Sequence, residues 1–139
     1  MRRLQTTEFE VVEPAFVSVR FHGSLDVDEA LAVFDAIDEA VAGESYCLME
    51  AFMTHIEGAS PEARRVSAER LKTIPHMAMA VVGGSFAQRM LAKLVLTAVN
   101  MIGSHELVAK FFKDSESARA WLREFRAKLA EDGRIARSP

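Results

Sequence analysis

The sequence has few of the residues that staple a small fold or carry metal and redox chemistry. Its 139 residues include one cysteine, Cys47, which excludes a disulfide framework and a cysteine-based metal site. The four histidines, His22, His55, His76 and His105, form no i, i+3 or i, i+4 pair, so we expect no metal ion and no cofactor. This cysteine usage is typical of a reducing compartment, and we expect a cytoplasmic protein.

Long apolar runs and a secretion signal are also missing. The longest apolar stretch is interrupted by Gly, Gln, Arg and Lys, so no membrane span is expected. The N-terminus, Met1-Arg-Arg-Leu-Gln, is followed by acidic residues rather than an apolar segment, which argues against a secretory leader. No basic cluster is interleaved with aromatic residues, and nucleic acid is therefore not an expected partner.

Charge is distributed unevenly along the chain. Residues 1–60 hold 3 basic and 12 acidic residues, a net charge of −9, whereas residues 61–139 hold 14 basic and 8 acidic residues, a net charge of +6. This asymmetry is compatible with a dipolar surface, with a self-complementary dimer, or with an even mixture of charge after folding.

Residues 76–102 form the unit around which the rest of the chain is organised. Six consecutive apolar residues, 77–82, show no alternation, which is typical of a central strand covered on both faces. Gly83 and Gly84 end that strand, and Ser85 is a suitable N-cap for the helix that follows.

The segments around this unit alternate between strands and helices. The pattern predicts strands within 8–22 on either side of Glu13-Pro14, at 46–53, 77–82 and 106–113, and helices at 26–42, 60–73, 85–102 and from 114 onward. We therefore expect an α/β fold with a mixed, largely parallel five-stranded sheet, an N-terminal hairpin and four helices. Residues 1–131 would form one domain and residues 132–139 a disordered tail.

Three of these helices have clear start signals. Asp26 is an N-cap with Glu29 as its reciprocal partner in a capping box. Ser60 followed by Pro61 marks the second helix, after an expected loop over 54–59. Asp114 caps the last helix.

The 85–102 helix carries more apolar surface than one sheet face requires. Its polar residues occupy an arc of roughly 120°, and most of the remainder is apolar. The apolar residues proposed as an interface or pocket wall are Met90, Leu91, Leu94, Val95, Ala98 and Val99. We expect another helix, a second subunit or an apolar ligand to cover this helix on a second side.

Several stretches together resemble the SpoIIAA-like branch of the STAS domains over nearly the whole domain. They are Leu48-Met-Glu50, Gly58-Ala-Ser-Pro-Glu-Ala-Arg64, Ala80-Val-Val-Gly-Gly-Ser-Phe86 and Phe112-Lys-Asp-Ser-Glu-Ser-Ala-Arg-Ala-Trp-Leu122. The resemblance implies a domain that binds partners, such as an anti-sigma factor, or a small molecule. The SpoIIAA-like branch is also related in shape to CRAL-TRIO lipid-transfer domains.

By its position in this resemblance, Ser60 is the candidate phosphoacceptor. The family's usual Asp-Ser/Thr-Ser-Gly is replaced here, because Ala59 precedes Ser60 and Pro61 follows it. A plain N-cap explains the same residues. A phosphate at this helix start would lie at the positive end of the helix dipole and near Arg64.

Two further places are candidate sites. Gly83, Gly84 and Ser85 offer backbone N–H groups for an anion at the carboxyl end of an interior strand, or else form only a tight turn. Glu50 lies in an apolar strand and needs a partner such as Arg20, either as a structural pair or as a general base.

The first functional hypothesis is a non-catalytic STAS-like regulatory or protein-interaction domain that dimerises through the 85–102 helix. The second is a carrier or sensor of a small apolar or amphipathic, lipid-like ligand bound beside that helix. A small serine hydrolase is the weakest hypothesis. Ser85 lies in a loose Gly-x-Ser-x-Ala elbow, but His105 precedes Asp114, the reverse of the order such enzymes use.

Overall fold

The computed structural model describes residues 2–100 and 106–135, which form one mixed sheet and four helices. The elements in chain order are β1 (Arg2–Arg3), β2 (Glu8–Glu13), β3 (Phe16–Leu25), α1 (Val27–Val41), β4 (Tyr46–Ala59), α2 (Pro61–Leu71), β5 (His76–Val82), α3 (Phe86–Asn100), β6 (Glu106–Phe112) and α4 (Ser115–Glu131). The strands lie in the order β1-β2-β3-β4-β5-β6, antiparallel up to β3 and parallel from β3 to β6.

The predicted fold class is confirmed, and the strand number is corrected from five to six. The extra strand is β1, in which Arg2 pairs with Phe9 and Arg3 with Glu8 at one edge of the sheet. Two charged residues carry no apolar pattern, so nothing in their sequence marks them as a strand.

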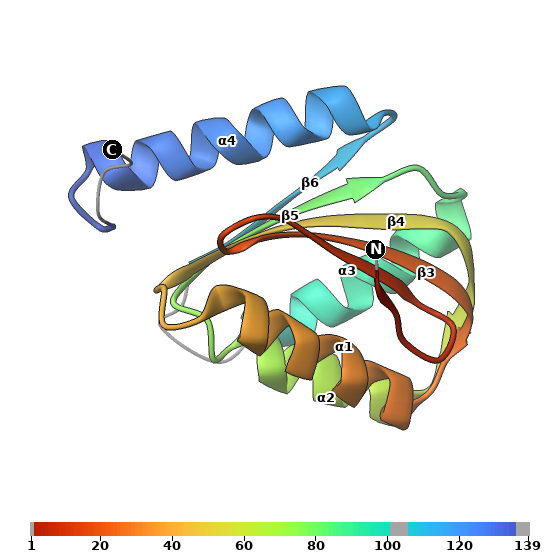
Figure 1. The fold of residues 1–139 in the computed structure, drawn as a ribbon. Helices are drawn as coiled ribbons and strands as arrows, with labels where there is room; N and C mark the ends of the chain where they lie inside the picture. Colours follow the sequence, from red (N-terminus) through yellow and green to blue (C-terminus); the bar gives the residue numbers. More distant parts are fainter. Residues whose placement is uncertain (1, 101–105, 136–139) are drawn as a thin grey trace.

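The helices form two layers around the sheet. Helices α1, α2 and α3 cover one face, and α4 lies alone on the other (Figure 1). Central strands buried on both faces explain the unbroken apolar run of β5. Odd-numbered β5 residues such as Met77 and Val81 pack toward the three-helix layer, and even-numbered ones such as Ala78 and Ala80 pack toward α4.

Strand β4 is longer than its sequence suggests. The expected loop at 54–59 is instead the second half of the strand, because it stays paired with β3 up to Leu25 and Ala59. Strand β5 ends earlier, since its last residue, Val82, lies opposite Phe52. The β3–β4 ribbon therefore continues alone toward the N-termini of α1 and α2 (Figure 1).

The predicted caps form as hydrogen bonds. Asp26 accepts from the N–H of Glu29 at 2.8 Å, Ser60 from Ala63 at 3.1 Å, and Asp114 from Ser117 at 2.8 Å. The cap at Asp114 holds the pKa of its carboxyl below the usual value.

The structure describes the predicted tail, residues 132–139, only as far as Ile135. There the N–H of Arg134 donates to the carbonyl of Leu129, and Ile135 packs on the α4 side of the core. Residues 136–139 lie outside the described part of the chain.

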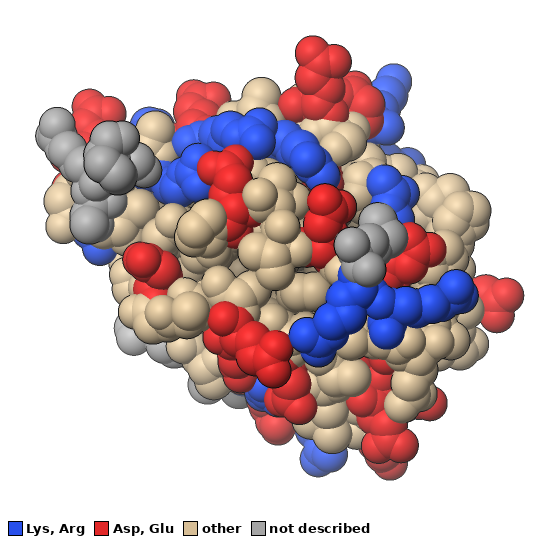
Figure 2. Space-filling model, in the orientation of Figure 1, with Lys and Arg blue, Asp and Glu red and all other residues tan. Residues whose placement is uncertain are grey.

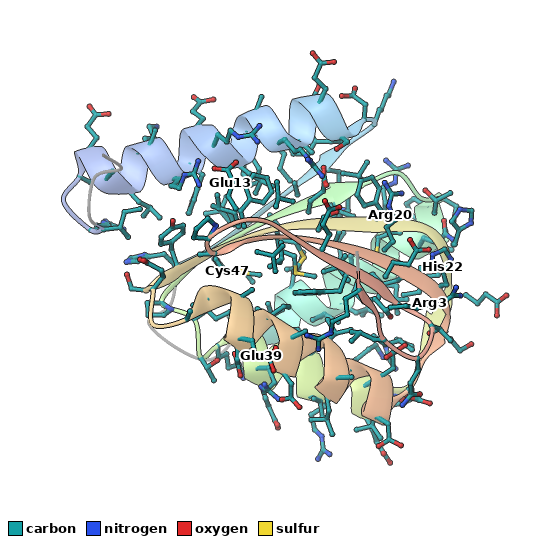
Figure 3. The ribbon with its side chains drawn as sticks, in the orientation of Figure 1. Arg3, Glu13, Arg20, His22, Glu39 and Cys47 are labelled. Atoms are coloured by element: carbon teal, nitrogen blue, oxygen red, sulfur yellow. The ribbon has the colours of Figure 1, made fainter. Side chains whose placement is uncertain are left out.

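Cys47 is completely buried on β4, between the sheet and the three-helix layer (Figure 3). Burial is the main cause that raises the pKa of its thiol to about 12, and the nearby Asp38 carboxylate adds to the effect. The thiol is therefore a core side chain without nucleophilic character at neutral pH.

Candidate functional site

The start of α3 is fixed to the end of the sheet by its turn and its side chains. Gly83 and Gly84 both adopt positive φ, at 70° and 94°. A Cβ at Gly83 would lie 2.6 Å from the hydroxyl oxygen of Thr54, so a larger residue does not fit this turn. Gln88 donates to the carbonyl oxygens of Thr54 and Ile56, at 3.0 and 2.9 Å, which anchors the first turn of α3 on β4.

This turn already uses two of the backbone donors that the sequence suggested for an anion. The N–H of Gly83 donates to Phe112 at 3.0 Å, and the N–H of Ser85 donates to the side chain of Gln88 at 2.7 Å. The hydroxyl of Ser85 accepts from the N–H of Gln88 at 3.2 Å, which makes Ser85 the N-cap. Anion binding here stays a prediction.

The outer side of α3 carries a row of exposed apolar side chains, here called the α3 row: Phe86, Met90 and Leu94. Their exposed fractions are 74%, 38% and 51%. They are spaced four residues apart and so lie on one side of the helix. Sequence reasoning included Met90 and Leu94 but missed Phe86, which fell within the polar arc of the helix.

The other predicted residues of this helix divide between the inner side and the undescribed part. Leu91 and Val95 are half-buried and contact the core. The side chains of Ala98 and Val99 lie outside what the structure describes. The predicted apolar set is therefore two surfaces, an outer row and an inner wall.

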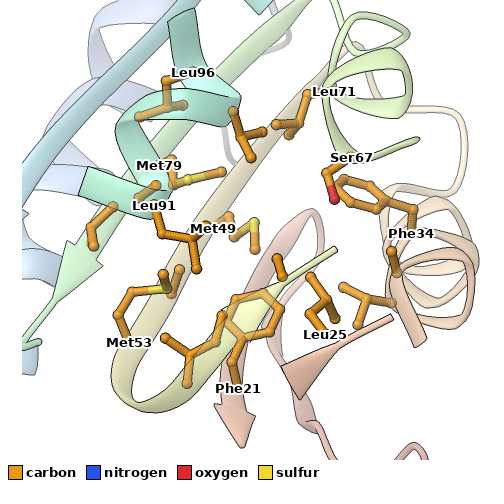
Figure 4. Close-up of a pocket in the computed structure, with 18 residues that line it drawn as sticks. Phe21, Leu25, Phe34, Met49, Met53, Ser67, Leu71, Met79, Leu91 and Leu96 are labelled. Carbon is orange, nitrogen blue, oxygen red and sulfur yellow. The ribbon is translucent and has the colours of Figure 1, made fainter. Parts of the chain in front are cut away.

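An apolar cavity of about 70 Å³ lies beneath α3. It is lined by residues of α1, α2, α3 and strands β3 to β5, with Met49, Met53 and Met79 among them (Figure 4). Ser67 is the polar residue of the lining, and its hydroxyl already donates to the carbonyl of Ala63 at 2.8 Å. The cavity thus offers contact to apolar atoms and no free polar anchor among its lining side chains.

A shallow groove runs along the surface between α2 and α3. It has a volume of about 380 Å³ and is lined by Pro61, Arg64, Arg65, Ala68, Glu69, Lys72 and Leu94. The Nε atom of Arg64 is buried there and has no hydrogen-bond partner among the described residues. The groove therefore places Leu94 of the α3 row beside three basic residues, Arg64, Arg65 and Lys72.

Ser60 and Arg64 both lie in the first turns of α2, as the sequence predicted. The hydroxyl of Ser60 is the N-cap acceptor, and the backbone N–H of Ser60 donates to Leu25 at 3.0 Å. Ser60 follows the extended half of β4, whereas Gly83 follows the shorter β5. Ser60 and the Gly83–Ser85 turn therefore do not form a single anion site in this structure.

Glu50 is fully buried on β4, and its partner is not Arg20. Arg119 of α4 donates to the carboxylate through Nε and Nη2, at 3.1 to 3.3 Å, and Ser18 donates at 3.0 Å. Ser115 also donates to it. Arg20 instead stacks on the ring of Phe52, with its guanidinium carbon 3.9 Å from the ring centre. Glu50 thus forms the structural ion pair that the sequence allowed, but with Arg119 in place of Arg20.

The predicted reciprocal role of Glu29 is wrong. Its N–H does bind Asp26, but its carboxylate turns toward the segment before β2 and accepts from the N–H groups of Gln5, Thr6 and Thr7. Burial acts to raise the pKa of Glu29, yet these hydrogen bonds together hold it below the usual 4.5. Glu29 therefore fixes the N-terminal segment on α1.

Ionic contacts also hold α4 to the sheet edge. Glu13 at the end of β2 accepts hydrogen bonds from Arg123 and Arg126 at 2.9 to 3.2 Å. On the surface, a band of basic side chains crosses the upper part of Figure 2. Figure 3 shows Glu13 between the sheet and α4. The hydrogen bond from Arg123 is the main cause that lowers the pKa of Glu13.

The described residues contain neither a metal-type cluster nor a membrane-length helix. No group of three or more His, Cys, Asp or Glu side chains is placed to hold an ion within residues 2–100 and 106–135. In the same part of the chain, every helix is too short or too polar to cross a bilayer. His105, the only histidine after Ser85, lies outside the described residues.

Several solved structures match this chain, and two of them illustrate the shared fold. An uncharacterized protein from the DUF3478 family of Shewanella loihica PV-4, with a SpoIIAA-like fold, superimposes with a TM-score of 0.60 at 18% identity, over 88% of this chain and 98% of its own. The anti-sigma factor antagonist SpoIIAA in its unphosphorylated form gives 0.53 at 12% identity, over 85% and 98%. At these identities the likeness concerns the fold.

No curated protein matches the sequence. The family model described as SpoIIAA-like, however, matches residues 16–123, from the first residue of β3 to the middle of α4. This range includes the whole parallel part of the sheet and the α3 row. The resemblance seen in the sequence is confirmed, and the chain belongs to the SpoIIAA-like family.

Proposed function

We propose that this chain is a non-catalytic regulatory domain that works by binding another protein, with the α3 row as its contact surface. The observation that carries the proposal is the exposure of Phe86, Met90 and Leu94 on one side of one helix. Contiguous exposed apolar side chains rimmed by polar residues are typical of protein interaction sites. The structural likeness to an anti-sigma factor antagonist supports a partner of the anti-sigma type.

Affinity purification from the native host tests this proposal. The row variant Phe86→Ser/Leu94→Ser is compared with wild type and with Val11→Ser, which removes an apolar side chain that is 52% exposed on β2. We expect wild type and Val11→Ser to retain the same partner protein and the row variant to lose it. Equal recovery by all three would refute the α3 row as the contact.

A carrier or sensor of a small apolar ligand is the second candidate, supported by the cavity beneath α3. At about 70 Å³ it is roughly half the engineered 150 Å³ cavity that admits benzene. A lipid-like molecule would therefore need α3 to move outward, with the Gly83–Ser85 turn nearest its polar end. This size difference is why protein binding comes first.

Native mass spectrometry and solvent extraction of the purified protein test the second candidate. We expect a co-purified apolar molecule whose amount falls when Val81 at the cavity wall becomes Asp, provided that circular dichroism shows the variant folded. Ala109→Asp, at an exposed position of β6, is the matched control. A bare protein that also fails to take up added dodecanoic acid would exclude this function.

Phosphorylation of Ser60 is the proposed regulatory step. A phosphate there would lie at the N-terminus of α2, one turn before Arg64, where the helix dipole favours negative charge. We expect a cognate kinase to label the wild type and the exposed-serine control Ser24→Ala, but not Ser60→Ala. Label that survives in Ser60→Ala would remove Ser60 from the mechanism.

A further inference from the structure

The three-helix layer has acidic charge on one side and basic charge on the other. Helix α1 contains five acidic residues and no lysine or arginine, while α3 contains Arg89 and Lys93 and no acidic residue. Helix α2 packs between them. The uneven charge of the sequence therefore survives folding as a gradient across one face, and acidic side chains gather over α1 in the lower part of Figure 2.

Apolar exposure follows the same layout. The α3 row lies on the basic side, next to Arg89. On the acidic side, Leu31 of α1 is 39% exposed, one turn after Asp28. Each side thus offers apolar surface next to charge, and the two charges have opposite sign.

The side of the layer between α2 and α3 supports contact with an acidic neighbour. The α2–α3 groove presents Arg64, Arg65 and Lys72 against a single acidic residue, Glu69. The buried Nε of Arg64 is without a hydrogen-bond partner among the described residues. Within one protomer, Asp35 and Asp38 of α1 bind Arg70 of α2, at 3.0 and 2.6 Å. Since Glu39 binds Arg2 and Glu29 is buried, Asp28 is the α1 carboxylate without an ion pair among the described residues.

We infer that a second copy of this chain covers the α3 row, related by a two-fold axis that runs along α2. Such an axis places α2 against its copy and α1 of each protomer against α3 of the other. It preserves helix direction, and α1 and α3 both begin on the same side of the molecule (Figure 1). Asp28 and Leu31 of one protomer then meet Arg89 and Met90 of its partner, twice.

The available area fits a weak dimer. Helices α1 and α3, of 15 residues each, are roughly 22 Å long, and α2, of 11 residues, is roughly 16 Å long. At a spacing of about 10 Å the three helices cover some ~600 Å² per protomer. This is about three quarters of the ~800 Å² per partner of a standard specific interface. The inference rests on the proposed function, because it names a second copy as one protein that binds the α3 row.

Sedimentation velocity of the purified chain, from ~5 to ~300 µM, tests the inference. We expect a monomer–dimer equilibrium whose dissociation constant rises about tenfold when salt rises from ~50 to ~500 mM. Asp28→Lys and Arg89→Glu should each weaken the dimer by about tenfold or more, and the double variant should regain most of the loss. Glu116→Lys, an exposed charge reversal on α4, should change nothing.

Three results would overturn the inference: a monomer at every concentration, a dimer that neither single variant weakens, or a double variant that stays as weak as the singles. Circular dichroism of each variant separates lost association from lost folding. Partner capture by the α3 row that persists in a strictly monomeric protein would refute the homodimer alone. The opposite result is a dimer that the double variant restores, together with affinity purification in which the α3 row variant loses no partner protein. That result would refute the wider proposal of a foreign partner.

Discussion

The two buried carboxylates of this domain, Glu29 and Glu50, are satisfied by different chemistry. Glu29 is held by backbone N–H groups and a threonine hydroxyl of one short segment, and no cation of residues 2–100 and 106–135 pairs with it. Glu50 is held by the guanidinium of Arg119 and by two serine hydroxyls from β3 and α4. The first arrangement fixes a terminus to the three-helix layer, and the second ties the opposite helix to the sheet. A buried charge therefore serves here as an attachment point for each covering layer.

The largest effect should come from removing the cation. We expect Arg119→Met to lower the free energy of unfolding by about 3 kcal/mol, because it leaves the Glu50 carboxylate buried without a counter-charge. Urea denaturation at pH 7 measures the loss. The control Arg123→Met breaks a more exposed pair with Glu13 and should cost less than about 1 kcal/mol. Equal losses would mean that the serine hydroxyls alone satisfy Glu50.

Replacing the other carboxylate should have a smaller and more local effect. We expect Glu29→Gln to cost about 2 kcal/mol, because its amide group turns N–H donors toward the N–H donors of residues 5–7. Hydrogen exchange should show faster exchange at Thr6 and Thr7 while β5 keeps its protection. Glu39→Gln, at an exposed ion pair with Arg2, is the control. Unchanged exchange at Thr6 and Thr7 would contradict the proposed attachment.

Lowering the pH should remove the stabilisation that the Glu29 carboxylate provides. The folded-state pKa of Glu29 lies below 4.5, so its ionised form stabilises the fold above that pH, and the stabilisation is lost as the pH falls through the folded-state pKa. The stability difference between wild type and Glu29→Gln should therefore be constant near neutrality and narrow below about pH 4.5. Urea titrations at several pH values measure this difference. If the difference in free energy of unfolding instead widens in acid, the pKa of Glu29 is raised on folding and not lowered.

The smallest effect should come from one hydroxyl. We expect Ser115→Ala to cost about 1 kcal/mol, because Arg119 and Ser18 still hold the Glu50 carboxylate. Thermal or urea unfolding measures it, with Ser24→Ala at an exposed position of β3 as the control. A cost equal to that of Arg119→Met would show that the network acts as a single unit.

Local signals in the sequence predicted the parts of this fold that short-range chemistry determines. The caps at Ser60 and Asp114 depend on residues within one helical turn, and the apolar run of β5 reports burial on both faces. Thr54 to Ala59 contain polar residues and a glycine, so they resemble a loop. They form a strand because β3 extends alongside them.

Long-range partners could not be predicted in the same way. Glu50 had to find a partner, but Arg119 is 69 residues away and comes to it only because α4 crosses back over β4 and β5. Glu29 has the spacing of a capping box and uses its carboxylate elsewhere, since the N-terminal segment passes close to α1. The division of the α3 residues into an outer row and a cavity wall likewise depends on how α1 and α2 pack beside them.

The inert thiol of Cys47 has a practical consequence. With its pKa near 12 and no exposed surface, this side chain should not react with maleimide reagents in the native protein. A cysteine introduced at Leu94 would then be the only reactive thiol of the chain. A fluorescent or spin probe attached there would report directly on whatever approaches α3, without any background from the wild-type sequence.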